Sequence, residues 1–401
     1  MTPRERVLRA IDFEPVDRVP MDLGGMRSTG ISCFAYPKLV DALGAPSHLP
    51  RVYDTWQMLA LPETPVLDAL GTDVITVELG AGTNAFDEPQ LWHAYDFNGR
   101  LPARVLDPEA FEDLPDGSVR NGNTLMVPDA YVFDSPHAGQ EIDLSGDIPM
   151  EDLDALRERL AGNRFTAERV DSIAAHCRRV REATDRAVLF CGLTAGLGYR
   201  GGMANFSMLC MTEPDYVTRL HTILIDHCVA QVERLLPAIT PYVDVLMFSS
   251  DDQGTQSTTI LPPAVFRELF VPHYRRATDA VHAIAPGLKI FLHCCGAVYD
   301  ILDDIIAAGF DVLNPVQWSA GGHSFREWKD KCRRRIALWG GGINTQSTLP
   351  LGTVDEVRKE CAEVVGCLGE DSGYVFCAIH NLLAEIPPEK VIALYETARN
   401  E

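Results

Sequence analysis

Residues 288–296 read Leu-Lys-Ile-Phe-Leu-His-Cys-Cys-Gly, an apolar run of strand length that ends in a histidine, two cysteines and a glycine. Imidazole and thiolate groups are ligands that suit zinc. On an extended segment, His293 and Cys295 point to the same side and Cys294 points to the other. The stretch therefore predicts a strand that carries part of a metal site. The alternative is a core strand, in which buried cysteine behaves as a small hydrophobe and the histidine finds a hydrogen-bond partner.

Short apolar segments recur on both sides of this strand, with room for helices between most of them. We expect eight strands, centred near residues 21, 76, 189, 246, 290, 312, 338 and 375. Strands that alternate with helices form parallel sheets, and eight of them suggest a closed α/β fold, the (β/α)8 TIM barrel. A doubly wound open sheet is the alternative. It is disfavoured because the first strand lacks Gly-x-Gly-x-x-Gly and Gly340–Gly342 comes too late for a dinucleotide fingerprint.

The remaining segments carry weaker signals. Thr2-Pro3-Arg4-Glu5 is typical of a helix start and predicts an N-terminal helical extension ending at Ile11. We expect residues 51–70 and 151–185 to be helical. Residues 81–150 show no sustained period, and we interpret them as an irregular insertion or lid within a single barrel domain spanning residues 1–401.

Composition excludes some classes of partner. The 401-residue chain has a formal net charge of −22, which argues against nucleic acid or an anionic membrane as a ligand and leaves room for a protein with a basic docking face. We see neither a signal peptide nor an apolar run of membrane-spanning length. The 11 cysteines are scattered without framework spacing, which fits a reducing compartment. We therefore expect a cytoplasmic protein.

Reactive side chains collect directly after the predicted strands, and in a barrel such positions all face one mouth. They are Arg27, Glu78, Asp251, Asp252, His293, Cys295, Asn314, Gln317, Gly340–Gly342, Asn344, Gln346, Cys377 and His380. Catalytic zinc normally has three protein ligands and one open position. The candidates for a third ligand are His380, Cys377 and Asp252. We favour His380, because it lies in the loop beyond the last strand.

Two further groups at the strand ends have alternative interpretations. Asp251 and Asp252 either hydrogen-bond His293, bind substrate or cap a helix. Capping is the weaker reading, because the next helix starts near Pro263. Gly340–Gly342 either forms a simple turn or allows a bulky cofactor to approach closely.

Several motifs together resemble the uroporphyrinogen decarboxylase superfamily, and within it the branch of cobalamin-dependent methyltransferases. The resemblance extends over nearly the whole chain. It rests on Arg4-Glu5-Arg6-Val7-Leu8, Asp17-Arg18-Val19-Pro20, Asp251-Asp252-Gln253-Gly254-Thr255-Gln256, His293-Cys294-Cys295-Gly296-Ala297, Asp311-Val312-Leu313-Asn314-Pro315-Val316-Gln317, Trp339-Gly340-Gly341 and Pro387-Pro388-Glu389.

The resemblance implies a (β/α)8 barrel with zinc on a His-x-Cys pair and a distant third ligand, often cysteine. When residues are counted back from Pro387, the position of that ligand falls nearer His380 than Cys377. A histidine there departs from the His-x-Cys…Cys pattern of the family. The decarboxylase itself is disfavoured. Its arginine-rich Met-Arg-Gln-Ala-Gly-Arg motif corresponds to Met26-Arg27-Ser28-Thr29-Gly30 here, so only Met-Arg is kept. Without further arginines, this segment cannot balance the carboxylates of a porphyrinogen.

These observations lead to the hypothesis of a zinc-dependent methyltransferase. It would demethylate a small methoxylated compound and pass the methyl group to the cobalt of a separate corrinoid protein. Zinc would sit on His293, Cys295 and His380. Four side chains would position the substrate: Asp251, Asp252, Asn314 and Gln317. Gly340, Gly341 and Gly342 would leave room for the corrin at the barrel mouth.

Other activities remain open at this stage. The zinc could instead activate a thiol such as coenzyme M, which takes a methyl group from methylcobamide. The acceptor could also be tetrahydrofolate, or the chain could be a decarboxylase-type lyase or a non-catalytic corrinoid-binding scaffold. The sequence leaves the oligomeric state open, with a homodimer as one option.

Overall fold

A parallel sheet forms the centre of the molecule. The computed structural model describes residues 1–78, 89–134, 148, 150–200 and 202–401. Among them, seven parallel strands are hydrogen-bonded in chain order from β4 to β15. They are β4 (Val74–Glu78), β10 (Ala187–Cys191), β11 (Val245–Ser250), β12 (Lys289–His293), β13 (Val312–Asn314), β14 (Ala337–Trp339) and β15 (Tyr374–Val375). Each contains one of the predicted strand centres.

The first predicted strand closes this sheet into a barrel. Met21 forms a parallel bridge with Phe376 beside β15, and the flanking backbone bonds from Phe376 to Pro20 and from Asp22 to Phe376 are both 2.8 Å long. On the other side, the Asp73 amide donates to the Met21 carbonyl at 2.7 Å. The Met21 amide in turn donates to the Asp73 carboxylate at 2.8 Å. The (β/α)8 barrel predicted from the sequence is confirmed.

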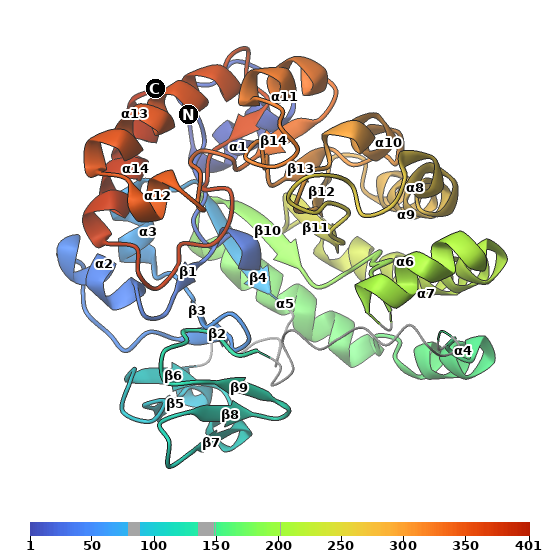
Figure 1. The fold of residues 1–401 in the computed structure, drawn as a ribbon, viewed down its shortest axis with the longest axis horizontal. Helices are drawn as coiled ribbons and strands as arrows, with labels where there is room; N and C mark the ends of the chain where they lie inside the picture. Colours follow the sequence, from blue (N-terminus) through green and yellow to red (C-terminus); the bar gives the residue numbers. More distant parts are fainter. Residues whose placement is uncertain (79–88, 135–147, 149, 201) are drawn as a thin grey trace.

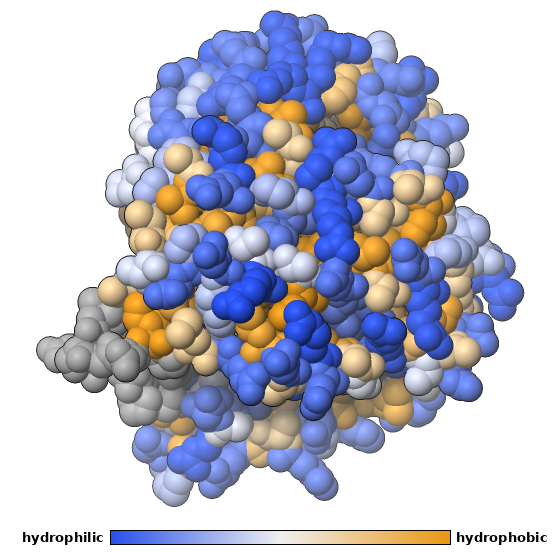
Figure 2. Space-filling model, turned by 90° about the vertical axis from the view of Figure 1, so that its right-hand side faces the viewer, coloured by the Kyte–Doolittle hydropathy of each residue, from blue (hydrophilic) through white to orange (hydrophobic). Residues whose placement is uncertain are grey.

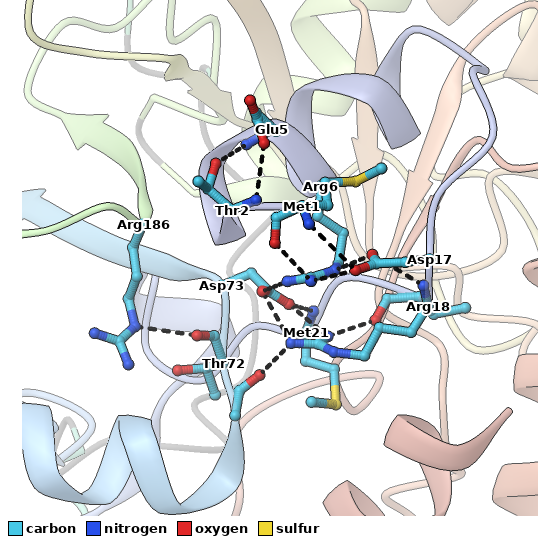
Figure 3. Close-up of polar contacts among 12 residues, drawn as sticks. Met1, Thr2, Glu5, Arg6, Asp17, Arg18, Met21, Thr72, Asp73 and Arg186 are labelled. Atoms are coloured by element: carbon cyan, nitrogen blue, oxygen red, sulfur yellow. Dashed lines mark hydrogen bonds and ion pairs between the residues drawn. The ribbon is translucent and has the colours of Figure 1, made fainter.

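A network of ion pairs holds this closure at the N-terminal end of the strands (Figure 3). The carboxylate of Asp73 is fully buried and accepts from Arg6 at 2.6 Å and from Arg18 at 2.7 Å. Arg6 also donates to Asp17 at 2.6 and 2.8 Å. Helix α1 (Pro3–Ile11) starts with a capping box between Thr2 and Glu5. The two N-terminal motifs of the sequence therefore fasten the first strand to β4.

Alternation along the strands divides the core in two. One set of side chains fills the barrel interior, including Val74, Leu189, Phe291 and Trp339, and Val7 of α1 covers the N-terminal end. The other set packs outward against the helices. These are α2 (Tyr36–Ala42), α3 (Thr64–Leu70), α5 (Ala167–Ala183), α6 (Met203–Thr212), α7 (Pro214–Ile239), α8 (Pro263–Leu269), α9 (Val271–Ile284), α10 (Leu302–Ala307), α11 (Phe325–Cys332), α12 (Thr348–Leu351), α13 (Val354–Leu368) and α14 (Pro388–Asn400).

The outer surface is mixed in character. The side that carries α6 to α9, at the right of Figure 1, combines hydrophilic residues with small hydrophobic patches (Figure 2). Among the described residues, none of the helices is long and apolar enough to cross a membrane.

The prediction of a helix over residues 51–70 is wrong for its first part. Strands β2 (Val52–Asp54) and β3 (Leu59–Ala60) lie there, and β3 pairs antiparallel with both β2 and β1 (Ile31–Ser32). Only α3 is helical. One of the two pairing partners of β3, the strand β1, is distant in the sequence, so tertiary context overrides the local pattern. The helix predicted over residues 151–185 is likewise two helices, α4 (Leu153–Gly162) and α5.

The insertion is more regular than predicted. Its described part forms two small antiparallel sheets that lie to one side of the barrel (Figure 1). Their strands are β5 (His93–Tyr95), β6 (Ala103–Val105), β7 (Phe111–Asp113), β8 (Val119–Asn121) and β9 (Thr124–Met126). The rest of the predicted lid, residues 81–88, 135–147 and 149, lies outside the described residues.

Candidate metal centre at the barrel mouth

The His-x-Cys pair leaves β12 on the inner side of the barrel. His293 follows Phe291 in the alternation, and its Nε2 lies 3.2 Å from the Cys295 Sγ. Cys294 is buried on the opposite side, among residues that pack against the helices. Gly296 then turns the chain with a φ of +91°, and a Cβ there would stand 2.2 Å from the Gly254 carbonyl oxygen. The predicted orientation of the pair is therefore present, and only glycine fits the turn.

A third donor joins the pair from the loop after β15. One ligand atom each from His293, Cys295 and His380 lie within 4.8 Å of one another. Donors on a tetrahedral zinc stand roughly 3.3 to 3.7 Å apart, so this set fits zinc with a small inward adjustment. Cys377 instead lies in the barrel core and is 1% exposed. The Asp252 Oδ1 also lies 3.8 Å from the His293 Nε2, but its side chain is half-exposed and it is not part of the set of three donors that lie within 4.8 Å of one another.

A hydrogen-bond chain fixes the tautomer of His293. Asn314 donates its amide group to the Trp339 carbonyl at 3.0 Å, so its Oδ1 is left as an acceptor. That oxygen lies 2.7 Å from the His293 Nδ1, which must carry the proton. The lone pair of Nε2 is therefore turned toward the Cys295 Sγ. Such an orienting partner is typical of histidines that bind metals.

Burial keeps the site neutral when no cation is bound. It lowers the pKa of His293, and it lowers the pKa of His380 to about 4, so both imidazoles are neutral near pH 7. Burial, together with the Asp252 carboxylate, raises the pKa of the Cys295 thiol. Neutral imidazoles are ready to bind a metal. A bound cation would favour the thiolate and thereby reverse the effect of burial on Cys295.

The loop that carries Cys295 is held by two of the residues predicted to position substrate. Asp252 accepts from the Cys295 amide at 2.8 Å, and Gln317 accepts from the Gly296 amide at 2.7 Å. The Asp252 side chain is 48% exposed, so part of it remains accessible from outside the barrel. Both residues therefore support the loop of a candidate metal ligand, and their contact with substrate stays a prediction.

Asp251 and Asn314 lie deeper than a substrate-binding role requires. Asp251 is buried, and its Oδ2 accepts from the Leu197 amide at 2.8 Å and from the hydroxyls of Ser249 and Tyr274 at 2.6 Å each. Burial raises the pKa of Asp251. Asn314 is wholly buried behind His293. The contacts of both side chains indicate that they hold neighbouring protein groups in place. Substrate positioning by them stays a prediction.

The packing of the three glycines does not support the prediction that they leave room for a corrin. A Cβ on Gly340 would lie 3.0 Å from both the Asn314 amide nitrogen and the Cys377 Sγ, and one on Gly341 would lie 2.7 Å from Val316. One on Gly342 would meet the Phe376 ring at 2.2 Å. The glycines let the end of β14 pack closely between its neighbours. Farther out, Gln346 donates to Gln256 at 3.2 Å, and the Asn344 amide donates to Glu360.

A cavity of about 550 Å³ adjoins the metal centre. Ser28 lines it and places its Oγ 3.3 Å from the His293 Nε2. Its polar lining includes Arg27, Asp54 and Glu78, with Trp56 beside them. Arg27 and Glu78 belong to the predicted strand-end set. Asp54 and Trp56 were missed, because they lie in the segment predicted to be helical.

Comparison with known proteins places these features in a family. The URO-D family model (uroporphyrinogen decarboxylase) matches residues 147–401. A uroporphyrinogen decarboxylase from Chlorobium limicola is 28% identical over 141 residues, which cover 34% of this chain and 37% of that protein. One from Syntrophotalea carbinolica is 24% identical over 174 residues, covering 41% and 47%. The chain thus spans less than half the length of these curated relatives.

A solved structure supports the fold over the full length. The methyltransferase from Methanosarcina mazei superposes with a TM-score of 0.56 at 18% identity, covering 100% of this chain and 99% of that one. At this identity the likeness establishes the shared fold. The range matched by the family model includes β10 to β15 and the His293–Cys295 pair. Because this match covers more than half of the chain, the protein belongs to the uroporphyrinogen decarboxylase (URO-D) family.

Proposed function

We propose that this protein is a zinc-dependent methyltransferase that moves a methyl group from a small methoxylated compound to the cobalt of a corrinoid protein. One observation carries the proposal. Three soft or borderline donors converge within 4.8 Å at the barrel mouth, directly beside a cavity large enough for a small molecule.

The side chains have distinct tasks in this proposal. His293, Cys295 and His380 hold the ion, and bound zinc supplies a Lewis acid for the ether oxygen of the substrate. Asn314 holds the proton on the His293 Nδ1, so that Nε2 stays available as a ligand. Asp252 and Gln317 hold the loop of Cys295 and Gly296 in place. The protein thus preorganises the donors before an ion binds.

The decarboxylase activity of the curated relatives is less well supported. The several carboxylates of a porphyrinogen would need several free cations, whereas Arg27 at the mouth is already flanked by Asp54 and Glu78. Methyl transfer from methylcobamide to a thiol, or to tetrahydrofolate, would use the same three ligands. We keep the methoxylated compound as the methyl donor, in agreement with the hypothesis drawn from the sequence.

A spectroscopic assay tests the proposal. The zinc-loaded protein is mixed with a Co(I) corrinoid protein and a panel of methoxylated compounds. Conversion of the Co(I) spectrum to that of methyl-Co(III) with at least one compound is the expected result. No response to any methoxylated compound, together with a reaction of methylcobamide and a thiol, would reverse the assignment. A metal-free protein that still bound corrinoid would indicate a scaffold.

A further inference from the structure

The cavity beside the metal centre contains a charged cluster that the metal ligands do not use. The Nε of Arg27 lies 3.3 Å from the Asp54 Oδ2 and 3.4 Å from the Glu78 Oε2. Asp54 is 5% exposed and Glu78 7% exposed, whereas the Arg27 side chain is 42% exposed. We name these three side chains the Arg27 cluster.

Three separate elements build the Arg27 cluster. Arg27 begins the short helix η1 (Arg27–Thr29), Asp54 ends β2, and Glu78 ends β4. Asp54 also accepts from the Gln57 amide at 2.7 Å, so its carboxylate is anchored independently of the arginine. With both carboxylates ionised, one positive and two negative charges sum to −1. The guanidinium is therefore already compensated before any ligand arrives.

An aromatic side chain of the cavity wall suits a small ring. Trp56 lines it and is 54% exposed, so its indole face is accessible to a ligand. The indole face also attracts cations. Ser28, next to Arg27 in the chain, reaches the His293 Nε2 at 3.3 Å. A ligand on Trp56 can therefore extend toward the metal centre.

We propose that the Arg27 cluster makes this cavity select neutral or cationic substrates and reject carboxylates and sulfonates. An entering anion would meet two buried carboxylates and an arginine whose charge is already balanced. Repulsion of this kind is an effective source of specificity. A hydroxyl or ammonium group could instead donate to Asp54 or Glu78. This inference rests on the proposed function for the identity of the ligand as a methyl donor.

Calorimetric titration of the zinc-loaded protein with three methoxybenzenes that differ only in the group at the para position tests the inference. The ligands are 4-methoxybenzylamine, 4-methoxyphenol and 4-methoxybenzoate, which carry a cationic, a neutral and an anionic group at the same ring position. We expect the benzoate to bind at least about tenfold more weakly than the other two. In the Glu78→Gln and Asp54→Asn variants, the difference in affinity between the benzoate and the other two ligands should shrink. Each substitution removes one negative charge and keeps the shape of the side chain.

A matched control sits on the outside of the barrel. Glu396→Gln removes the same charge from an exposed carboxylate of α14, paired with Arg358 at 3.2 Å, and should leave the ratio of affinities unchanged. Equal or tighter binding of the benzoate, no binding of any of the three, or ratios unaffected by both cavity substitutions would overturn the inference. Binding is measured without methyl transfer. Selective binding without demethylation of any compound would therefore refute the proposed function alone.

Discussion

The two ends of the barrel use charged and polar groups in opposite ways. At the N-terminal end, Asp73 accepts from two arginines, and Asp244 accepts from Arg4 at 2.7 Å and from Arg181 at 3.0 Å. Those carboxylates are saturated within the chain. At the mouth, His293, Cys295 and His380 turn their donor atoms toward one another.

The difference separates stability from function. Charges balanced inside the chain hold the first strand in the barrel and need nothing from outside. Donor atoms that converge on one point can instead share a cation that enters between them. Substitutions at the N-terminal end should therefore change the free energy of unfolding, whereas substitutions at the mouth should change metal binding.

The largest effect is expected at Asp73. Asp73→Ala leaves Arg6 and Arg18 without their shared buried partner and removes the acceptor for the Met21 amide. We expect the free energy of unfolding to fall by about 3–5 kcal/mol, measured by urea denaturation. Asp226→Ala, which breaks an exposed pair with Arg276, should cost less than about 1 kcal/mol. Equal losses in both variants would show that the buried network around Asp73 adds no more to the free energy of unfolding than an exposed ion pair does.

The next effect concerns the partner of His293. Asn314→Ala removes the acceptor for Nδ1, and zinc affinity should fall by about 10- to 100-fold in competition titrations with a chelator. Asn314→Asp keeps the acceptor and should retain most of the affinity. If the aspartate variant lost as much affinity as the alanine variant, the hydrogen bond to His293 would not be the cause.

A smaller effect distinguishes two carboxylates by the sign of their pH dependence. Burial raises the pKa of Asp22 to about 6, whereas the Arg6 guanidinium lowers that of Asp17 to about 2. A raised carboxyl pKa favours the folded state at low pH, and this contribution is lost as the pH rises from about 4 to 6. The opposite holds for Asp17, whose contribution is lost as the pH falls toward 2.

Substitution of Asp22 tests this sign. The unfolding free energy of Asp22→Asn minus that of the wild type should rise by on the order of 1–2 kcal/mol between pH 4.5 and pH 7. Chemical denaturation of both proteins at each pH measures this difference. A difference that stays constant with pH would show that Asp22 does not titrate in this range.

Local patterns predicted much of this architecture. The strand of residues 288–292 and the shared side of His293 and Cys295 follow from period-two alternation, which needs no tertiary information. The barrel followed from the spacing of strands. The closure at Met21 could not be foreseen in detail, because it depends on the side chain of Asp73 as well as on backbone pairing.

The missed features all depend on contacts between distant segments. Asp54 ends β2, which lies in a sheet that also includes the distant strand β1, whereas the local sequence favoured a helix there. The close packing of Gly340–Gly342 depends on neighbouring strands and loops. Local patterns placed Asn314 and Gln317 at the mouth, but could not show that they hold His293 and Gly296.

Metal analysis of the purified protein tests the central claim most directly. We predict about one zinc per chain in the wild type, loss of that zinc in His293→Ala and in Cys295→Ala, and retention in Cys294→Ala, whose side chain points away from the site. A wild type without zinc after supplementation, or ligand variants that keep their zinc, would contradict the assignment of His293 and Cys295.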